Sequence, residues 1–186
     1  MKKLLATLFA LSLVFCLCAC AGNNNSADDK ATANEIKAVV QNAVRCTTEI
    51  FEVRTLAFEE NALKDNYHIV TDDQFKTYAD LEAFVKSTYV DSVAEKILKG
   101  EGISRTVYLD VDGKLCIDVS TILPRGYFVN WDNYSVTVKN VEEDTCTFVV
   151  KTTMTEPGEN VEPQEYTLEA TAKKINGKWK LETVIR

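Results

Sequence analysis

Apolar side chains in the first third of the chain recur every three or four residues, which is the spacing of an amphipathic helix. The pattern predicts a helix over residues 32–53, with Thr32 or Asn34 as its N-cap. The expected buried stripe consists of Ile36, Val39, Val40, Ala43, Val44, Thr47, Ile50 and Phe51.

Two shorter helices are expected further along the chain. Asp80 is the predicted cap of the first and Asp91 the predicted cap of the second, which should end at Gly100 as a left-handed cap residue. Their apolar stripes consist of Leu81, Phe84, Val85 and Tyr89, and of Val93, Ala94, Ile97 and Leu98. Residues 54–66 show no clear period, and residues 67–70 fit a short strand.

After Gly102 the period of the apolar residues changes from helical spacing to strict alternation, which is typical of strands. The pairs Asp112-Gly113 and Asn176-Gly177 predict hairpin turns. Residues 134–138 and 145–154 are expected to pair across a short acidic turn. The sequence therefore predicts an α+β fold, with N-terminal helices packed on a curved antiparallel sheet of about six strands.

The N-terminus has a different pattern, because Lys2 and Lys3 precede a run without any charge that reaches Cys18. Ala19 and Cys20 then resemble the lipobox of bacterial lipoproteins, in which the small residue precedes the cut and the cysteine takes the lipid, with palmitate as an acyl chain. The apolar run is shorter than the 18 or more residues expected of a transmembrane anchor, which is the alternative. We therefore expect a signal peptide over residues 1–19.

The mature chain would then start at Cys20, carry a flexible polar tether over residues 20–30 and fold as one domain over residues 31–186. Removal of Lys2 and Lys3 leaves 19 basic against 28 acidic residues, a formal net charge of −9. An acidic domain repels nucleic acid and anionic lipid. The expected location is therefore extracytoplasmic, and the expected contact with the cell membrane is through the lipid on Cys20 alone.

Few residues of the mature chain suggest catalysis or metal binding. Three cysteines remain after Cys20, namely Cys46, Cys116 and Cys146, without a CxxC pair, so we expect buried thiols, with one disulfide that includes Cys146 as the alternative. The single histidine, His68, has no predictable partner for a catalytic pair. We expect a protein that is not an enzyme and that holds no metal or cofactor.

Two acidic segments have simpler explanations than cation binding. Residues 110–113 (Asp-Val-Asp-Gly) look like the start of a calcium loop, but Thr121 stands where the loop would need a glutamate. A hairpin turn explains the same residues. Residues 156–163 form an acidic segment with two prolines and one glycine, which is typical of a solvated loop.

The most unusual connection is residues 122–132, because it joins two predicted strands yet carries three aromatic residues and an arginine. Tyrosine, tryptophan and arginine are enriched in binding hot spots. The predicted partner-binding residues are Arg125, Gly126, Tyr127 and Trp131. The alternative is that Phe128 and Trp131 fill one end of the core.

Several short motifs resemble the bacterial DL-endopeptidase inhibitor family (IseA type), within the small cystatin-like and NTF2-like α+β lipoproteins. The motifs are residues 112–115 (DGKL), Arg125-Gly126, residues 130–132 (NWD) and residues 176–180 (NGKWK). The resemblance implies an inhibitor without enzymatic activity, whose partner is a secreted cell-wall peptidase of the NlpC/P60 type. The chain departs from the family in its expected lipid anchor and in its acidic segment over residues 156–163.

The sequence leaves two further function classes open. The second is a lipoprotein that binds a small molecule or peptide in a pocket between the helices and the sheet. The third is a hydrolase that uses His68. An apolar pocket with a few polar groups would favour the second class, whereas a solid core with aromatic side chains projecting from residues 122–132 would favour the partner-binding protein.

Overall fold

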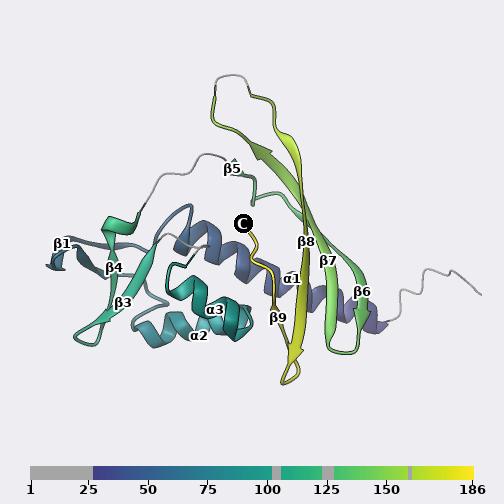
Figure 1. The fold of residues 1–186 in the computed structure, drawn as a ribbon, viewed down its shortest axis with the longest axis horizontal. Coiled ribbons are helices and arrows are strands. Elements are labelled where there is room, and N and C mark those ends of the chain that lie inside the picture. Colours follow the sequence, from purple (N-terminus) through teal and green to yellow (C-terminus); the bar gives the residue numbers. More distant parts are fainter. Residues whose placement is uncertain (1–26, 102–105, 123–127, 159–160) are drawn as a thin grey trace, which may run out of the picture.

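Three α-helices and two antiparallel sheets make up the computed structural model, which describes residues 27–101, 106–122, 128–158 and 161–186 (Figure 1). The predicted α+β class is confirmed. The expectation of one sheet of about six strands is wrong, because the described residues form nine strands in a four-stranded and a five-stranded sheet. The signal peptide, Cys20 and most of the tether lie outside the described residues.

The first helix, α1 (Ala27–Arg45), continues directly into a π-helical segment, η1 (Cys46–Phe51). Its buried residues Ile36, Val40 and Ala43 confirm the predicted apolar stripe. The predicted N-caps Thr32 and Asn34 are wrong, because both lie inside the helix. The helix begins five residues before Thr32, and Ala27, Lys30 and Ala31 in that stretch are good helix formers, so neither predicted cap residue starts the helix.

The next two helices are α2 (Tyr78–Thr88) and α3 (Asp91–Leu98). Thr77, not Asp80, is the N-cap of α2, and the two form a capping box in which the Asp80 carboxylate accepts from the Thr77 backbone N–H at 2.8 Å. Val90, not Asp91, is the N-cap of α3. Gly100 follows α3 with a φ of 69°, as predicted for a left-handed cap.

Sheet A holds four short strands in the order β1-β2-β4-β3. Their bounds are β1 (Phe58–Lys64), β2 (Tyr67–Val70), β3 (Val107–Val111) and β4 (Lys114–Asp118). Strand β1 falls in the stretch without a predicted element. Nearly all of its side chains are exposed, so the strand has no alternating apolar signal.

Sheet B is larger and strongly curved, and β7 is its central strand (Figure 1). Its strands are β5 (Phe128–Val129), β6 (Ser135–Glu142), β7 (Thr145–Thr155), β8 (Gln164–Ile175) and β9 (Lys178–Leu181). Both β5 and β6 pair with one edge of β7, and β8 pairs with the other edge and carries β9. The predicted pairing of residues 134–138 with residues 145–154 is confirmed.

The two predicted Gly-containing hairpin turns are also confirmed. Asp112 and Gly113 have φ values of 53° and 78°, and Asn176 and Gly177 have values of 52° and 77°. Two consecutive positive φ angles define the turn that matches the twist of antiparallel strands. These short turns set the registers of β3 with β4 and of β8 with β9.

One continuous core joins α1, the shorter helices and both sheets. Helix α1 contacts β9 and β6, so it spans the inner side of sheet B (Figure 1). The chain end closes the core, because Ile185 is fully buried and its carbonyl accepts a hydrogen bond from the Thr47 hydroxyl. The backbone N–H of Val90 donates to the Leu181 carbonyl at 3.0 Å, which ties the end of α2 to β9.

Candidate functional site

The connection between the two sheets places exposed apolar side chains on both sides of a short segment. It leaves sheet A through η2 (Val119–Thr121) and enters sheet B at β5. Ile122 is 41 % exposed and Phe128 is 59 % exposed. The predicted site residues Arg125, Gly126 and Tyr127 lie outside the described residues.

Trp131 occupies a different environment from Phe128. It is only 6 % exposed and belongs to the core. Its ring packs edge-on against Tyr134 and Tyr166, with centroid distances of 6.1 and 6.3 Å. The alternative that Phe128 and Trp131 both fill one end of the core is therefore correct for Trp131 and wrong for Phe128, whose side chain is exposed.

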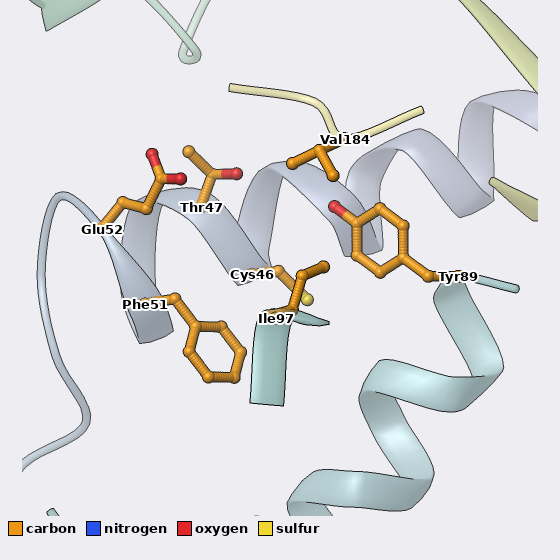
Figure 2. A pocket seen from close by; sticks show the side chains of 7 residues that line it. All are labelled: Cys46, Thr47, Phe51, Glu52, Tyr89, Ile97 and Val184. Carbon is orange, nitrogen blue, oxygen red and sulfur yellow. The ribbon is translucent and has the colours of Figure 1, made fainter. Parts of the chain in front are cut away.

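A small cavity lies in the described part of the core, between η1, the shorter helices and the C-terminal segment. Figure 2 shows this cavity, which is lined by Cys46, Thr47, Phe51, Glu52, Tyr89, Ile97 and Val184. Its volume is about 10 Å³, which is room for one water molecule. A cavity of this size does not accommodate an organic ligand.

Burial makes the thiols of the core poor nucleophiles. Cys46, Cys116 and Cys146 are all buried and unbonded, which confirms the predicted free thiols. Burial raises the pKa of the Cys46 thiol to about 12, although Arg45 next to it opposes the shift, and raises the pKa of Cys146 to about 11. A thiolate is the reactive form, so these residues are unsuited to nucleophilic catalysis at neutral pH.

His68 lies on β2 without a catalytic partner among the described residues. Its Nδ1 is 2.8 Å from the carbonyl oxygen of Glu59, and its ring packs edge-on against Phe58 at 5.4 Å. In the register of β2 with β4, His68 is opposite Ile117, whereas Ile69 is opposite Cys116. Neighbouring residues of a strand face opposite sides of the sheet, so His68 and Cys116 point apart.

The segment that resembled a calcium loop is a turn. The Asp110 carboxylate accepts a hydrogen bond from the Gly113 backbone N–H at 3.0 Å, and this contact stabilises the hairpin turn. No cluster of three or more histidine, cysteine or acidic residues suited to a metal occurs in the described ranges. Likewise, no described helix combines the length and apolar character that a membrane span requires.

A polar groove is the second candidate feature, and sequence reasoning missed it. It has a volume of about 230 Å³ and separates α1 and η1 from the turn that leads into β6. Its lining residues are Gln41, Val44, Arg45, Thr48, Glu49, Trp131, Asp132 and Tyr134. The residues from the helix and from the turn are more than 80 positions apart, so no local sequence signal could have joined them.

Arg45 is held in place at the edge of this groove by several contacts. Its Nε donates to the Glu49 carboxylate at 2.9 Å, and its Nη1 donates to the Gln74 side chain at 2.5 Å. The guanidinium also lies over the rings of Phe75 and Phe84, at 5.3 and 5.4 Å. The arginine charge is therefore already matched within the protein.

The comparisons with known proteins give no relative for this chain. No protein-family model matches it, and neither a curated protein nor a solved structure does.

Proposed function

We propose that this protein is a lipoprotein of the cell envelope, anchored through Cys20, that binds a protein partner with the surface around residues 122–128. One observation carries the proposal: Ile122 and Phe128 are both exposed and flank a segment that also contains Arg125 and Tyr127. Exposed apolar side chains that occur singly need no explanation, whereas contiguous ones are typical of interaction sites, and these two are six residues apart in one connection. The residue types on this segment are those of binding hot spots.

The proposed partner is a cell-wall DL-endopeptidase of the NlpC/P60 type, which the protein would inhibit without being an enzyme itself. The support for this choice is the resemblance of residues 112–115, 125–126, 130–132 and 176–180 to the IseA-type inhibitors. The α+β fold agrees with that class. The cavity beside Cys46 has room for only one water molecule, so it gives no support to the alternative of an internal ligand pocket.

The shape of the molecule is compatible with such an arrangement at a membrane. In Figure 1, α1 begins at the right-hand end of the view, and this is the end that the tether from Cys20 would reach. The helical turn η2, which immediately precedes Ile122, lies at the opposite, left-hand side. Strand β5, which carries Phe128, lies between these two ends, above α1 in the view. An anchor at the start of α1 would leave this surface free to meet a partner in the cell wall.

The lipid anchor is tested by replacing Cys20→Ser and following the protein in membrane and soluble fractions. We expect loss of diacylglycerol incorporation and departure from the membrane fraction. Cys18→Ser is the matched control, because Leu17 makes Cys18 a poor lipidation site, and it should leave the anchor unchanged. Lipid incorporation in Cys20→Ser at the level of the unmutated protein would overturn the lipoprotein proposal.

The binding activity is tested by measuring hydrolysis of peptidoglycan fragments by a purified NlpC/P60 peptidase, with and without this protein. We expect inhibition at micromolar concentration. Phe128→Ala should weaken it, whereas Leu63→Ala, which truncates another exposed apolar residue far along the chain on β1, should not. Full peptidase activity at micromolar concentrations of the unmutated protein would reject the inhibitor function.

A further inference from the structure

The groove between α1 and the turn before β6 has an excess of negative charge. Three charged residues line it: Arg45, Glu49 and Asp132. Arg45 and Glu49 neutralise each other through their ion pair at 2.9 Å. Asp132 is exposed, and no described residue forms an ion pair or a hydrogen bond with its side chain, so none of the described residues neutralises this carboxylate.

The turn that carries Asp132 is rigidly held. The Asn130 backbone N–H donates to the Thr153 carbonyl at 2.8 Å, and the Asn133 N–H donates to the Asn130 carbonyl at 3.3 Å. From β7, the Thr152 hydroxyl contacts the carbonyl oxygens of Asn130 and Asn133 at 2.5 and 2.9 Å. The carboxylate is therefore presented from a fixed backbone, which reduces the entropy lost when it binds a ligand.

The size and walls of the groove select the kind of group that fits. Its volume of about 230 Å³ is below the roughly 300–1,000 Å³ of pockets for drug-sized ligands, so it suits one side chain. Val44 and the aromatic rings of Trp131 and Tyr134 offer apolar contact to an alkyl stem. The Asp132 carboxylate attracts a cation at the same place.

We propose that this groove binds the cationic head of a lysine or arginine side chain from the protein partner, with Asp132 as its charge partner. This inference rests on the proposed function, because it assigns the partner's side chain to a groove that is lined in part by the same connection that carries Phe128. Asp132 follows Phe128 by four residues in one connection, so a single partner can contact Phe128 and insert a side chain into the groove.

The indole N–H signals of the two tryptophans provide a test that needs no peptidase. Both indole nitrogens, in Trp131 and Trp179, are buried and have no hydrogen-bond partner in the described residues. Only Trp131 lines the groove, whereas Trp179 lies on β9. Titration of the isotope-labelled full chain with Nα-acetyl-lysine amide should therefore shift the Trp131 signal and leave the Trp179 signal in place.

A charge variant and a matched control make the test specific. Asp132→Asn keeps the shape of the side chain, and we expect binding about threefold to fivefold weaker, as for an exposed ion pair. Asp144→Asn removes the same charge from an exposed residue in the turn between β6 and β7 and should leave binding unchanged. Nα-acetyl-norleucine amide, which lacks the charge, should bind no more tightly than the lysine probe binds to Asp132→Asn.

Four results would overturn the proposal: no movement of the Trp131 signal at millimolar probe, equal movement of both tryptophan signals, equal weakening by Asp132→Asn and Asp144→Asn, or equal affinity for the norleucine probe. Cadaverine that binds ten times more tightly than the lysine probe would assign the groove to a free diamine and reject a partner side chain. Because the titration contains no peptidase, failure of the inhibitor function leaves this test valid, and the reverse is also true.

Discussion

Phe128 and Trp131 are three residues apart in one connection, yet their surroundings are opposite. Phe128 is 59 % exposed on the short strand β5, which pairs only with the last residues of β7. Trp131 is 6 % exposed and packs between Tyr134 and Tyr166. Both residues are large and aromatic, and such residues are common in protein cores and in binding interfaces. The residue type alone therefore does not predict whether the core or a partner buries the ring.

The largest expected effect separates these two residues by stability. Trp131→Ala should lower the free energy of unfolding by about 3–5 kcal/mol, because it removes a buried ring and leaves a cavity. Phe128→Ala should change it by less than about 0.5 kcal/mol, as is usual for an exposed position. Urea unfolding followed by circular dichroism measures both values. Equal losses for the two variants would show that Phe128 also belongs to the core.

The second effect concerns partner binding, for which we expect Phe128 to matter although it contributes little to stability. Phe128→Ala should weaken inhibition of the peptidase by about 2 kcal/mol, or roughly 30-fold, if Phe128 is a hot spot. The measurement is the inhibition constant at a temperature where every variant is folded. A Phe128→Ala protein that inhibits as well as the unmutated chain would remove this residue from the proposed surface.

The third effect tests whether the core around Cys46 excludes solvent. Burial raises the pKa of the Cys46 thiol from its ordinary value of 9.0 to about 12. Above pH 9 the thiol of the unfolded chain loses its proton while the thiol of the folded chain keeps it. The contribution of this thiol to the free energy of unfolding is therefore fully present below pH 9 and is lost as the pH rises towards 12. The slope from this group is at most about 1.4 kcal/mol per pH unit.

Urea unfolding at several pH values between about 8 and 10.5 measures the first part of that decline. Cys46→Ala should make it shallower, whereas the same measurement on Phe128→Ala should reproduce the slope of the unmutated chain. An identical slope in Cys46→Ala would mean that the thiol is not protected by burial and that the cavity opens to solvent.

The smallest expected effect is that of Arg125→Ala on stability. Arg125 belongs to the proposed surface, so its removal should change the free energy of unfolding by less than about 0.5 kcal/mol while weakening inhibition. Thermal melting and the inhibition assay together check this. A variant that melts early and inhibits normally once folded would show that Arg125 has a structural role.

Local patterns were sufficient to predict much of the fold. The helical spacing from Ile36 to Phe51 and the turn signals at Asp112-Gly113 and Asn176-Gly177 were correct because each depends on a few neighbouring residues. The cap of α2 was misplaced by three residues, since Thr77 and Asp80 cap the helix together and either one is a credible N-cap by type. Boundaries of this kind are set by small energy differences between adjacent residues.

The division into two sheets was not predictable from the same patterns. Almost all side chains of β1 are exposed, so its sequence lacks the alternation of apolar and polar residues that predicts a strand. It is a strand because it pairs with β2. Whether β4 and β6 share a sheet depends on how the connection over residues 119–134 runs in space, and alternation within each strand carries no information about that.

The sequence by itself determined the α+β class, the apolar face of α1 and the hairpin turns, because each follows from periodicity or turn chemistry, whereas it favoured unpaired buried thiols and left one disulfide open. Only the tertiary structure decided that Trp131 is a core residue and Phe128 a surface residue, and that Asp132 faces α1 across a groove. The reason is physical: burial and the meeting of distant side chains depend on how helices and sheets pack, and no short stretch of sequence contains that information.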